Sequence, residues 1–227
     1  MDEEYGKIWP SEYYAADALA CDNCTWIVYK VGETEEDISS WLQKYAPSKT
    51  YRDDGIGWIS IESDKFYSPH RDVIGLQDSW EKLQQSGRPI SITTITELAK
   101  MHNVTDGKWL FYVDTGLKVD HLWTLVSTGI ANGTLNASSA KVSTVNDLSG
   151  DTEHVICIYN TDFTDLSQVE GLNQEIRRIG IKCMLQYKPD VYTLIGIYRN
   201  NQWGLRPTIY QSSFDIGTGQ SNVSQLS

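Results

Sequence analysis

The sequence predicts an α+β fold built on one antiparallel sheet of about seven strands. Helical and strand patterns alternate along most of the chain, but in two places one strand pattern follows another with no helix between them. Strands joined in this way pair antiparallel, because a parallel pair needs a longer crossover connection. In addition, each helical pattern carries one apolar stripe, which favours helices packed on a single face of the sheet.

Five helices are predicted from apolar residues that recur three or four positions apart. The first follows Thr34 and Asp37, which we interpret as a capping pair, and the second is stopped by Gly87 and Pro89. The fifth ends at Gly180, a residue typical of helix ends. The five apolar stripes cover residues 38–45, 76–83, 95–102, 119–130 and 166–179.

Seven strands are predicted from short apolar and β-branched runs that lie between these helices. Apolar residues alternate most regularly in the second strand, which contains Trp58, and in the third, which contains Trp109. The predicted strands cover residues 25–31, 56–62, 108–114, 140–144, 155–159, 183–187 and 193–198.

The chain is predicted to form a single folded domain over residues 24–210, because no internal repeat and no long Pro- or Gly-rich linker divides it. Residues 1–23 mix acidic residues with aromatic ones, and we expect them to form a partly ordered acidic arm. Residues 211–227 consist mostly of Ser, Gln, Gly and Asn, which predicts a disordered C-terminal tail.

The net charge of −11 comes from 19 Lys and Arg residues against 30 Asp and Glu residues. A protein of this charge is repelled by bulk nucleic acid, so binding to DNA is not expected. The charge is unevenly spread, since residues 1–64 carry a net −9 and residues 173–210 a net +4, which leaves room for a local basic groove.

No stretch of 18 uninterrupted apolar residues is present, and the acidic N-terminus does not resemble a secretory signal. We therefore expect no contact with a membrane. The predicted location is the cytoplasm, with the nucleus as an alternative.

No pattern in the sequence indicates a catalytic centre or a cofactor site, so we expect neither an enzyme nor a cofactor. The Asp-Thr-Gly triplet at 114–116 matches the aspartic-protease signature, but that chemistry needs two carboxylates and the chain has one triplet. Cys21 and Cys24 have the spacing of zinc ligands, for which His154 and Cys157 are the candidate partners. Because residues three apart on a strand point to opposite faces, a metal site is not expected.

Eight tryptophans are a high number for this length. Most of them are expected to anchor the core, with the indole N–H bonded to a partner. The alternative role is a platform on which a base or another flat cation stacks. Trp58, which follows Gly57 in a predicted strand, is the tryptophan that we expect to form an exposed platform.

Several short motifs in a fixed order give the chain a resemblance to known families. Gly107-Lys108-Trp109, the helical segment 119–123, the strand segment 140–143 and the helix at 169–180 resemble the mRNA cap-binding translation initiation factor 4E. The chain is similar over residues 24–210 to the basophilic leukaemia expressed protein family, an uncharacterised group with a 4E-like fold. The motifs that carry this second resemblance are the segments 75–80, 86–89, 107–109, 140–143, 187–190 and 207–210. The resemblance implies a curved antiparallel sheet backed by helices.

Factors of the 4E type stack methylguanine between two tryptophans and hold its phosphates with Arg and Lys, so the resemblance implies a related binding role. Residues 89–107, where the second stacking tryptophan would lie, contain no aromatic residue, so we do not expect the cap-stacking pair. Lys141, near the phosphate-binding strand, has the matching chemistry.

We therefore expect a non-catalytic binding module whose concave sheet face accepts RNA or a nucleotide. The candidate ligand-binding residues are Trp58, Arg88, Lys141, Lys188 and Arg206. The alternative is a protein-interaction adaptor, in which the helical face docks partner peptides and the acidic arm steers a basic partner.

Overall fold

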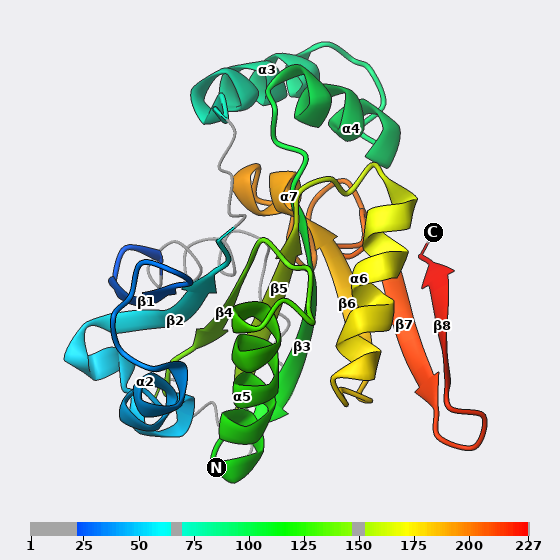
Figure 1. Ribbon diagram of the computed structural model, residues 1–227. Coiled ribbons are helices and arrows are strands. Elements are labelled where there is room, and N and C mark those ends of the chain that lie inside the picture. The colour runs from blue at the N-terminus through cyan, green and yellow to red at the C-terminus, as the bar shows by residue number, and fades with distance from the viewer. Residues whose placement is uncertain (1–21, 65–69, 147–152, 227) are drawn as a thin grey trace, which may run out of the picture.

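The computed structural model describes residues 22–64, 70–146 and 153–226, and its centre is one open sheet of eight strands (Figure 1). Across the sheet the strands follow the order β1-β2-β4-β5-β3-β6-β7-β8. Their bounds are β1 Thr25–Lys30, β2 Ile56–Glu62, β3 Gly107–Asp114, β4 Ser139–Ser143, β5 Glu153–Asn160, β6 Leu185–Pro189, β7 Tyr210–Asp215 and β8 Gln220–Gln225.

Six of the seven neighbouring pairs in this sheet are antiparallel, and β1 and β2 pair parallel. The parallel pair is possible because helix α2 (Ile38–Lys44) and two short 3-10 turns (Pro47–Lys49 and Arg52–Asp54) form a long connection between the two strands. The prediction of an α+β fold on a mainly antiparallel sheet is therefore confirmed, with one parallel pair at the edge.

All five predicted helices are present, and a short sixth helix is found among the described residues. Helices α5 (Leu117–Ala131) and α6 (Leu166–Arg178) cross the same face of the sheet, while α3 (Val73–Gln85) and α4 (Ile92–Met101) pack together at one end of the molecule (Figure 1). The sixth helix, α7 (Asp190–Leu194), lies against the other face of the sheet, where Thr193 reaches Lys108 of β3. Within the described ranges no helix is long and apolar enough to cross a bilayer.

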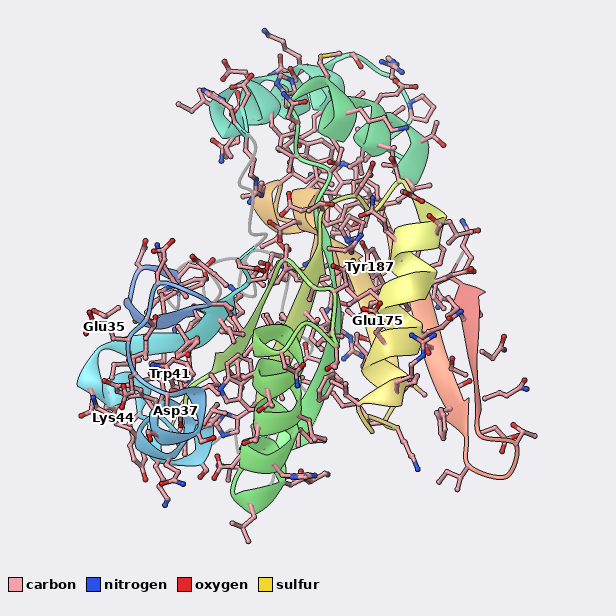
Figure 2. All side chains as sticks on the ribbon, viewed as in Figure 1. Glu35, Asp37, Trp41, Lys44, Glu175 and Tyr187 are labelled. Atoms are coloured by element: carbon pink, nitrogen blue, oxygen red, sulfur yellow. The ribbon has the colours of Figure 1, made fainter. Side chains whose placement is uncertain are left out.

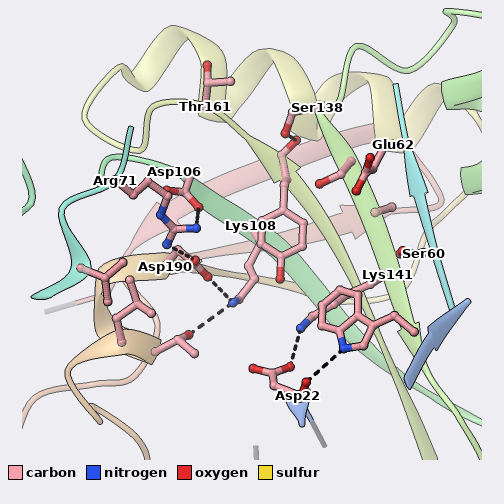
Figure 3. Close-up of a pocket in the computed structure, with 17 residues that line it drawn as sticks. Asp22, Ser60, Glu62, Arg71, Asp106, Lys108, Ser138, Lys141, Thr161 and Asp190 are labelled. Atoms are coloured by element: carbon pink, nitrogen blue, oxygen red, sulfur yellow. Dashed lines mark hydrogen bonds and ion pairs between the residues drawn. The ribbon is translucent and has the colours of Figure 1, made fainter. Parts of the chain in front are cut away.

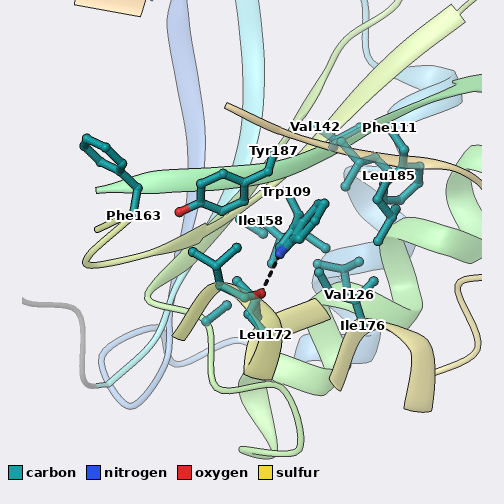
Figure 4. Close-up of a cluster of buried hydrophobic side chains, with 14 of the residues drawn as sticks. Trp109, Phe111, Val126, Val142, Ile158, Phe163, Leu172, Ile176, Leu185 and Tyr187 are labelled. Atoms are coloured by element: carbon teal, nitrogen blue, oxygen red, sulfur yellow. Dashed lines mark hydrogen bonds between the residues drawn. The ribbon is translucent and has the colours of Figure 1, made fainter. Parts of the chain in front are cut away.

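The hydrophobic core fills the space between the sheet and helices α5 and α6 (Figure 4). Trp109 of β3 and Trp123 of α5 are fully buried there, and the indole N–H of Trp109 donates to the carbonyl of Val169 in α6 at 2.9 Å. The core-anchor role expected for most of the tryptophans holds in full for Trp109, whereas Trp123 is buried but its indole N–H has no hydrogen-bond partner among the described residues.

The start of α2 differs from the predicted capping pair of Thr34 and Asp37. Asp37 is itself the cap residue, and its carboxylate accepts from the backbone N–H groups of Ser39 and Ser40 at 3.0 and 3.2 Å (Figure 2). The Thr34 hydroxyl instead accepts from the backbone N–H of Lys30, in the turn that follows β1.

Two predictions about the C-terminal half are wrong. Residues 193–198 do not form a strand, because Pro189 starts helix α7 immediately after β6, and the chain then continues as a loop. Residues 211–225 are not a disordered tail, since β7 and β8 form a hairpin that extends the sheet. Residues 1–21 of the predicted acidic arm lie outside the described residues.

Candidate ligand-binding pocket

The face of the sheet opposite α5 and α6, here called the polar face, carries charged side chains because of the strand pleat. Trp109 points into the core, so its neighbour Lys108 points to the polar face. Residues paired across a ladder share a face, which places Lys188 of β6 beside Lys108 and Cys157 of β5 beside Lys141 of β4. Trp58 of β2 joins them, because the Lys141 ammonium lies over its ring.

A pocket of about 410 Å³, here called the first pocket, opens on the polar face (Figure 3). Its charged lining combines the cations Arg71, Lys108 and Lys141 with the carboxylates Asp22, Glu62, Asp106 and Asp190. Hydroxyl groups supply most of the remaining polar wall, from Ser60, Ser138, Ser139, Tyr159, Thr161 and Thr193. The ring of Trp26, whose residue is 37% exposed, completes one side. This volume lies in the range typical of small-molecule sites.

Four of these charged side chains form one continuous network at the base of the pocket. Lys108 Nζ lies 2.6 Å from Asp190 Oδ1, and Arg71 Nη2 lies 2.8 Å from Asp190 Oδ2 (Figure 3). Arg71 Nη1 also lies 3.4 Å from Asp106 Oδ2. Tertiary contacts bring these residues together from distant parts of the chain, since Arg71 and Asp190 are 119 positions apart.

The two carboxyl groups of this network have pKa values that move in opposite directions. Burial alone would raise the pKa of Asp190, but Lys108 and Arg71 together hold it well below its usual range. Burial and the neighbouring Asp190 carboxylate raise the pKa of Asp106 to about 7, with Arg71 opposing the change. Near neutral pH the Asp106 carboxyl is therefore protonated part of the time, and in that form it donates one hydrogen bond and accepts others.

Lys141 lies in an aromatic cluster formed by Trp26 and Trp58. Its Nζ lies 3.8 Å from the centre of the Trp58 ring and 4.6 Å from that of Trp26, and it contacts Asp22 Oδ1 at 3.2 Å. The same Asp22 oxygen accepts from the indole N–H of Trp58 at 2.8 Å. Because Trp58 is only 7% exposed, the prediction that it is an exposed platform is wrong. Trp26, its partner across the β1–β2 ladder, is the indole that lines the pocket.

The other three predicted site residues lie outside the first pocket. Lys188 is buried beside it, with its Nζ 3.7 Å from the centre of the Tyr198 ring, and burial together with the nearby Lys108 lowers its pKa to about 7. Arg88 is exposed at the α3–α4 end and pairs with Glu97 at 2.8 Å. Arg206 is exposed in the loop before β7.

Sequence reasoning missed Arg71, Asp106 and Asp190. Two of them stand at motifs that it did single out, since Asp106 directly precedes Gly107-Lys108-Trp109 and Asp190 is the last residue of the segment 187–190. The register explains why they meet: Gly107 pairs with Pro189 across the β3–β6 ladder, and the Asp190 N–H donates to the Asp106 carbonyl at 2.9 Å. The available signal was an aspartate just before the start of one predicted strand and another just after the end of a second.

Two polar atoms in the wall of the first pocket are buried and have no hydrogen-bond partner among the described residues: Ser60 Oγ and Arg71 Nε. Buried polar atoms are nearly always hydrogen-bonded in folded proteins, so each such exception needs an explanation. A ligand in the pocket would supply the missing partners.

Cys21, one of the residues considered for metal chemistry, lies outside the described residues, and the described ones do not converge on this pocket. The Asp114 carboxylate pairs with Lys118 at 2.9 Å, and both side chains are largely exposed. His154 lies on the core side of β5, with its ring nitrogens bonded to the Ser143 carbonyl and the Thr115 hydroxyl, whereas Cys157 lies on the polar face. The pleat therefore separates this pair, as their spacing predicts.

Comparison with known proteins gives one family match and a set of similar solved structures. The family model described as basophilic leukemia-expressed protein Bles03 matches residues 76–196, which is 121 of the 227 residues. Among solved structures, the chain is similar to a schistosome eIF4E complexed with m7GpppA and 4E-BP, with 15% identity over 47% of this chain and a TM-score of 0.36. It is also similar to C. elegans eIF4E-3 in complex with the 4E-binding protein Mextli and a cap analog, with 25% identity over 39% of this chain and a TM-score of 0.29. The similarity spans 58% and 52% of the length of those two chains.

Proposed function

The chain belongs to the basophilic leukemia-expressed protein Bles03 family, and we propose that it is a non-catalytic binding module that holds a nucleotide in the first pocket. The observation that carries this proposal is the pair of buried, unpartnered polar atoms in the pocket wall, Ser60 Oγ and Arg71 Nε. Hydrogen bonds from a ligand to both atoms would offset the free-energy penalty of burying them without partners.

The chemistry of the lining supports a nucleotide over other small molecules. The half-exposed ring of Trp26 offers a stacking surface for a base. Glu62 and the partly protonated Asp106 carboxyl match the donors and acceptors on the edge of a base. Arg71 and Lys108 supply positive charge for a phosphate group.

The charge balance supports a small ligand over a long RNA strand. The pocket lining contains three cations and four carboxylates, so it does not form the positive track that a polyanion requires. Arg88 and Arg206, two further cations of the predicted site, lie away from this pocket, and Arg88 is engaged by Glu97. We therefore propose a mononucleotide-sized charged unit as the ligand of the first pocket.

Calorimetric titration of the full chain with AMP, GMP, CMP, UMP and m7GpppA at 150 mM salt tests the proposal. At least one nucleotide is expected to bind saturably below 1 mM, and Trp26→Ala is expected to weaken that binding roughly 5- to 100-fold through the loss of stacking. Tyr51→Ala is the control, because Tyr51 is similarly exposed at 40% and does not line the pocket. Absence of saturable binding to every nucleotide would overturn the proposal.

A second pair of variants tests the unpartnered hydroxyl directly. Ser60→Ala is expected to weaken binding about fivefold, because it removes one hydrogen bond to the ligand, while stability changes little since Ser60 Oγ has no partner in the free protein. Ser127→Ala is the matched control: Ser127 is also buried with an unpartnered hydroxyl, but it lies in α5, away from the pocket. Equal effects of the two substitutions on affinity would contradict a role for Ser60 in binding.

A further inference from the structure

A second pocket, of about 450 Å³, lies next to the first pocket and shares part of its wall. Ser138 and Thr161 line both pockets, and Figure 3 shows them together at one rim of the first. From this rim the second pocket extends toward the N-terminal half of α6, where Ser167, Gln168 and Gly171 form its wall.

The boundary between the two pockets consists of small hydroxyl side chains held in place by hydrogen bonds. The Ser138 N–H and hydroxyl both donate to the Tyr159 carbonyl, at 3.0 and 3.2 Å. The Thr161 hydroxyl donates to Gln168 Oε1 at 3.0 Å, and its carbonyl accepts from the Thr105 hydroxyl at 3.2 Å. These hydrogen bonds hold Ser138 and Thr161 in place, and the boundary that the two residues form between the pockets is here called the ridge.

The second pocket has a different chemistry from the first. No lysine or arginine is among its described lining residues, and its one carboxylate, Glu175, accepts from the backbone N–H of Asn136 at 2.7 Å. Amide and hydroxyl groups form the rest of its polar wall, and Ser63 Oγ there is buried with no hydrogen-bond partner in the described structure. Such a lining suits an uncharged group with several hydrogen-bonding positions, such as a sugar, and does not suit a phosphate.

Gly171 keeps this second pocket open on the side of α6. It lies within the helix, where glycine is an unfavourable residue, and a Cβ atom added at this position would meet no atom within 4 Å. A larger side chain at position 171 would therefore enter the pocket without displacing the protein around it.

We propose that the two pockets are subsites for one ligand, a nucleotide whose phosphate carries a second sugar. The nucleotide occupies the first pocket, the linkage crosses the ridge of Ser138 and Thr161, and the second sugar occupies the uncharged pocket. A dinucleotide and a nucleoside-diphosphate sugar share this chemistry. This inference rests on the proposed function of the first pocket.

The test compares affinities for AMP, the dinucleotide ApA, UMP and UDP-glucose in calorimetric titrations of the full chain. At least one extended ligand is expected to bind tenfold or more tightly than its mononucleotide, and the one that does so distinguishes the two sources of the second sugar. Gly171→Leu is expected to reduce that ratio to about 1, because the leucine side chain fills the second pocket. Gln174→Leu, on the exposed side of the same helix, is the matched control and is expected to keep the ratio.

The outcomes separate this inference from the one on which it rests. Saturable mononucleotide binding with no gain for either extended ligand, or a gain that Gly171→Leu leaves intact, would overturn the second subsite and leave the proposed function in place. No binding of any nucleotide would overturn both. The melting temperatures of the two leucine variants check that each one is folded.

Discussion

Lys108 and Asp190 form a buried ion pair, with 2.6 Å between Lys108 Nζ and Asp190 Oδ1, at the base of the first pocket. The pair joins the start of β3 to the start of α7, and the Asp190 carboxylate also accepts from Arg71. Removing one partner of a buried ion pair destabilises the folded protein, because the remaining charge stays buried with no opposite charge beside it.

Lys108→Met is therefore expected to lower the free energy of unfolding by roughly 3 kcal/mol, as measured by urea denaturation. Lys118→Met is the control, because Lys118 makes an ion pair of 2.9 Å with Asp114 in which both side chains are more than 60% exposed. A pair exposed to that degree contributes little to stability, because solvent screens the attraction. Similar losses in the two variants would show that the Lys108–Asp190 pair is not the structural anchor we infer.

Lys188 is expected to make stability rise with pH in the alkaline range. Burial and the nearby Lys108 lower the pKa of Lys188 from 10.5 to about 7, so between these values the unfolded chain binds more protons than the folded protein. The free energy of unfolding then increases from about pH 7 towards pH 10. Lys188→Met is expected to remove this rise and to stabilise the protein below pH 7 by roughly 5 kcal/mol. Parallel stability curves for the two proteins between pH 6 and 9.5 would refute this prediction.

Asp106 is expected to make stability fall as the pH rises from about 4 to 7. Burial and Asp190 raise the pKa of Asp106 from 3.8 to about 7, so between these values the folded protein binds more protons than the unfolded chain. The stability contributed by this group is complete below about pH 4 and is lost as the pH rises through 7. In Asp106→Asn the free energy of unfolding is expected to fall less between pH 4 and 7 than in the wild-type protein, by about 2 kcal/mol. Glu97→Gln, an exposed acid outside the pocket, should leave the slope of the wild-type protein unchanged.

Arg177 is expected to hold the C-terminal hairpin on the domain. Its guanidinium donates to the carbonyls of Ile181, Cys183 and Ser212 and to the Ser212 hydroxyl, at 2.6 to 3.0 Å. Arg177→Met leaves these acceptors without their partner, with an expected loss of roughly 3 kcal/mol in stability and faster hydrogen exchange over residues 210–225. Arg178→Met provides the comparison, since Arg178 is exposed and its hydrogen bond within the described residues goes to Gln174, at 3.4 Å. Unchanged exchange in the hairpin of Arg177→Met would contradict this role.

The helices and most of the strands could be predicted from the sequence because their signals are local. Each helix has its apolar residues on one face, and stop signals such as Gly87 and Gly180 follow within a few positions. The two errors are segments in which distant contacts decide the outcome. The run at 193–198 begins inside helix α7, whose first residue, Asp190, is fixed by Lys108 and Arg71. The polar segment at 211–225 is ordered by its ladder with β6 and by Arg177.

The candidate site could be predicted only in part, for a similar reason. Both Lys141 and Lys188 lie in short motifs of the sequence, and the pleat places both on the polar face, where Lys141 lines the first pocket and Lys188 lies outside it. Trp58 was expected to be open, yet Asp22, 36 positions away, covers its edge while Lys141 covers its ring.

The sequence by itself determined the fold class, because the period of the apolar residues sets which elements form and which side of each is buried. Only the tertiary structure decided which charges meet. The network of Arg71, Asp106, Lys108 and Asp190 depends on the register between β3 and β6 and on the position of α7. Strand register and helix docking are set by packing across the whole domain, and no short stretch of sequence contains that information.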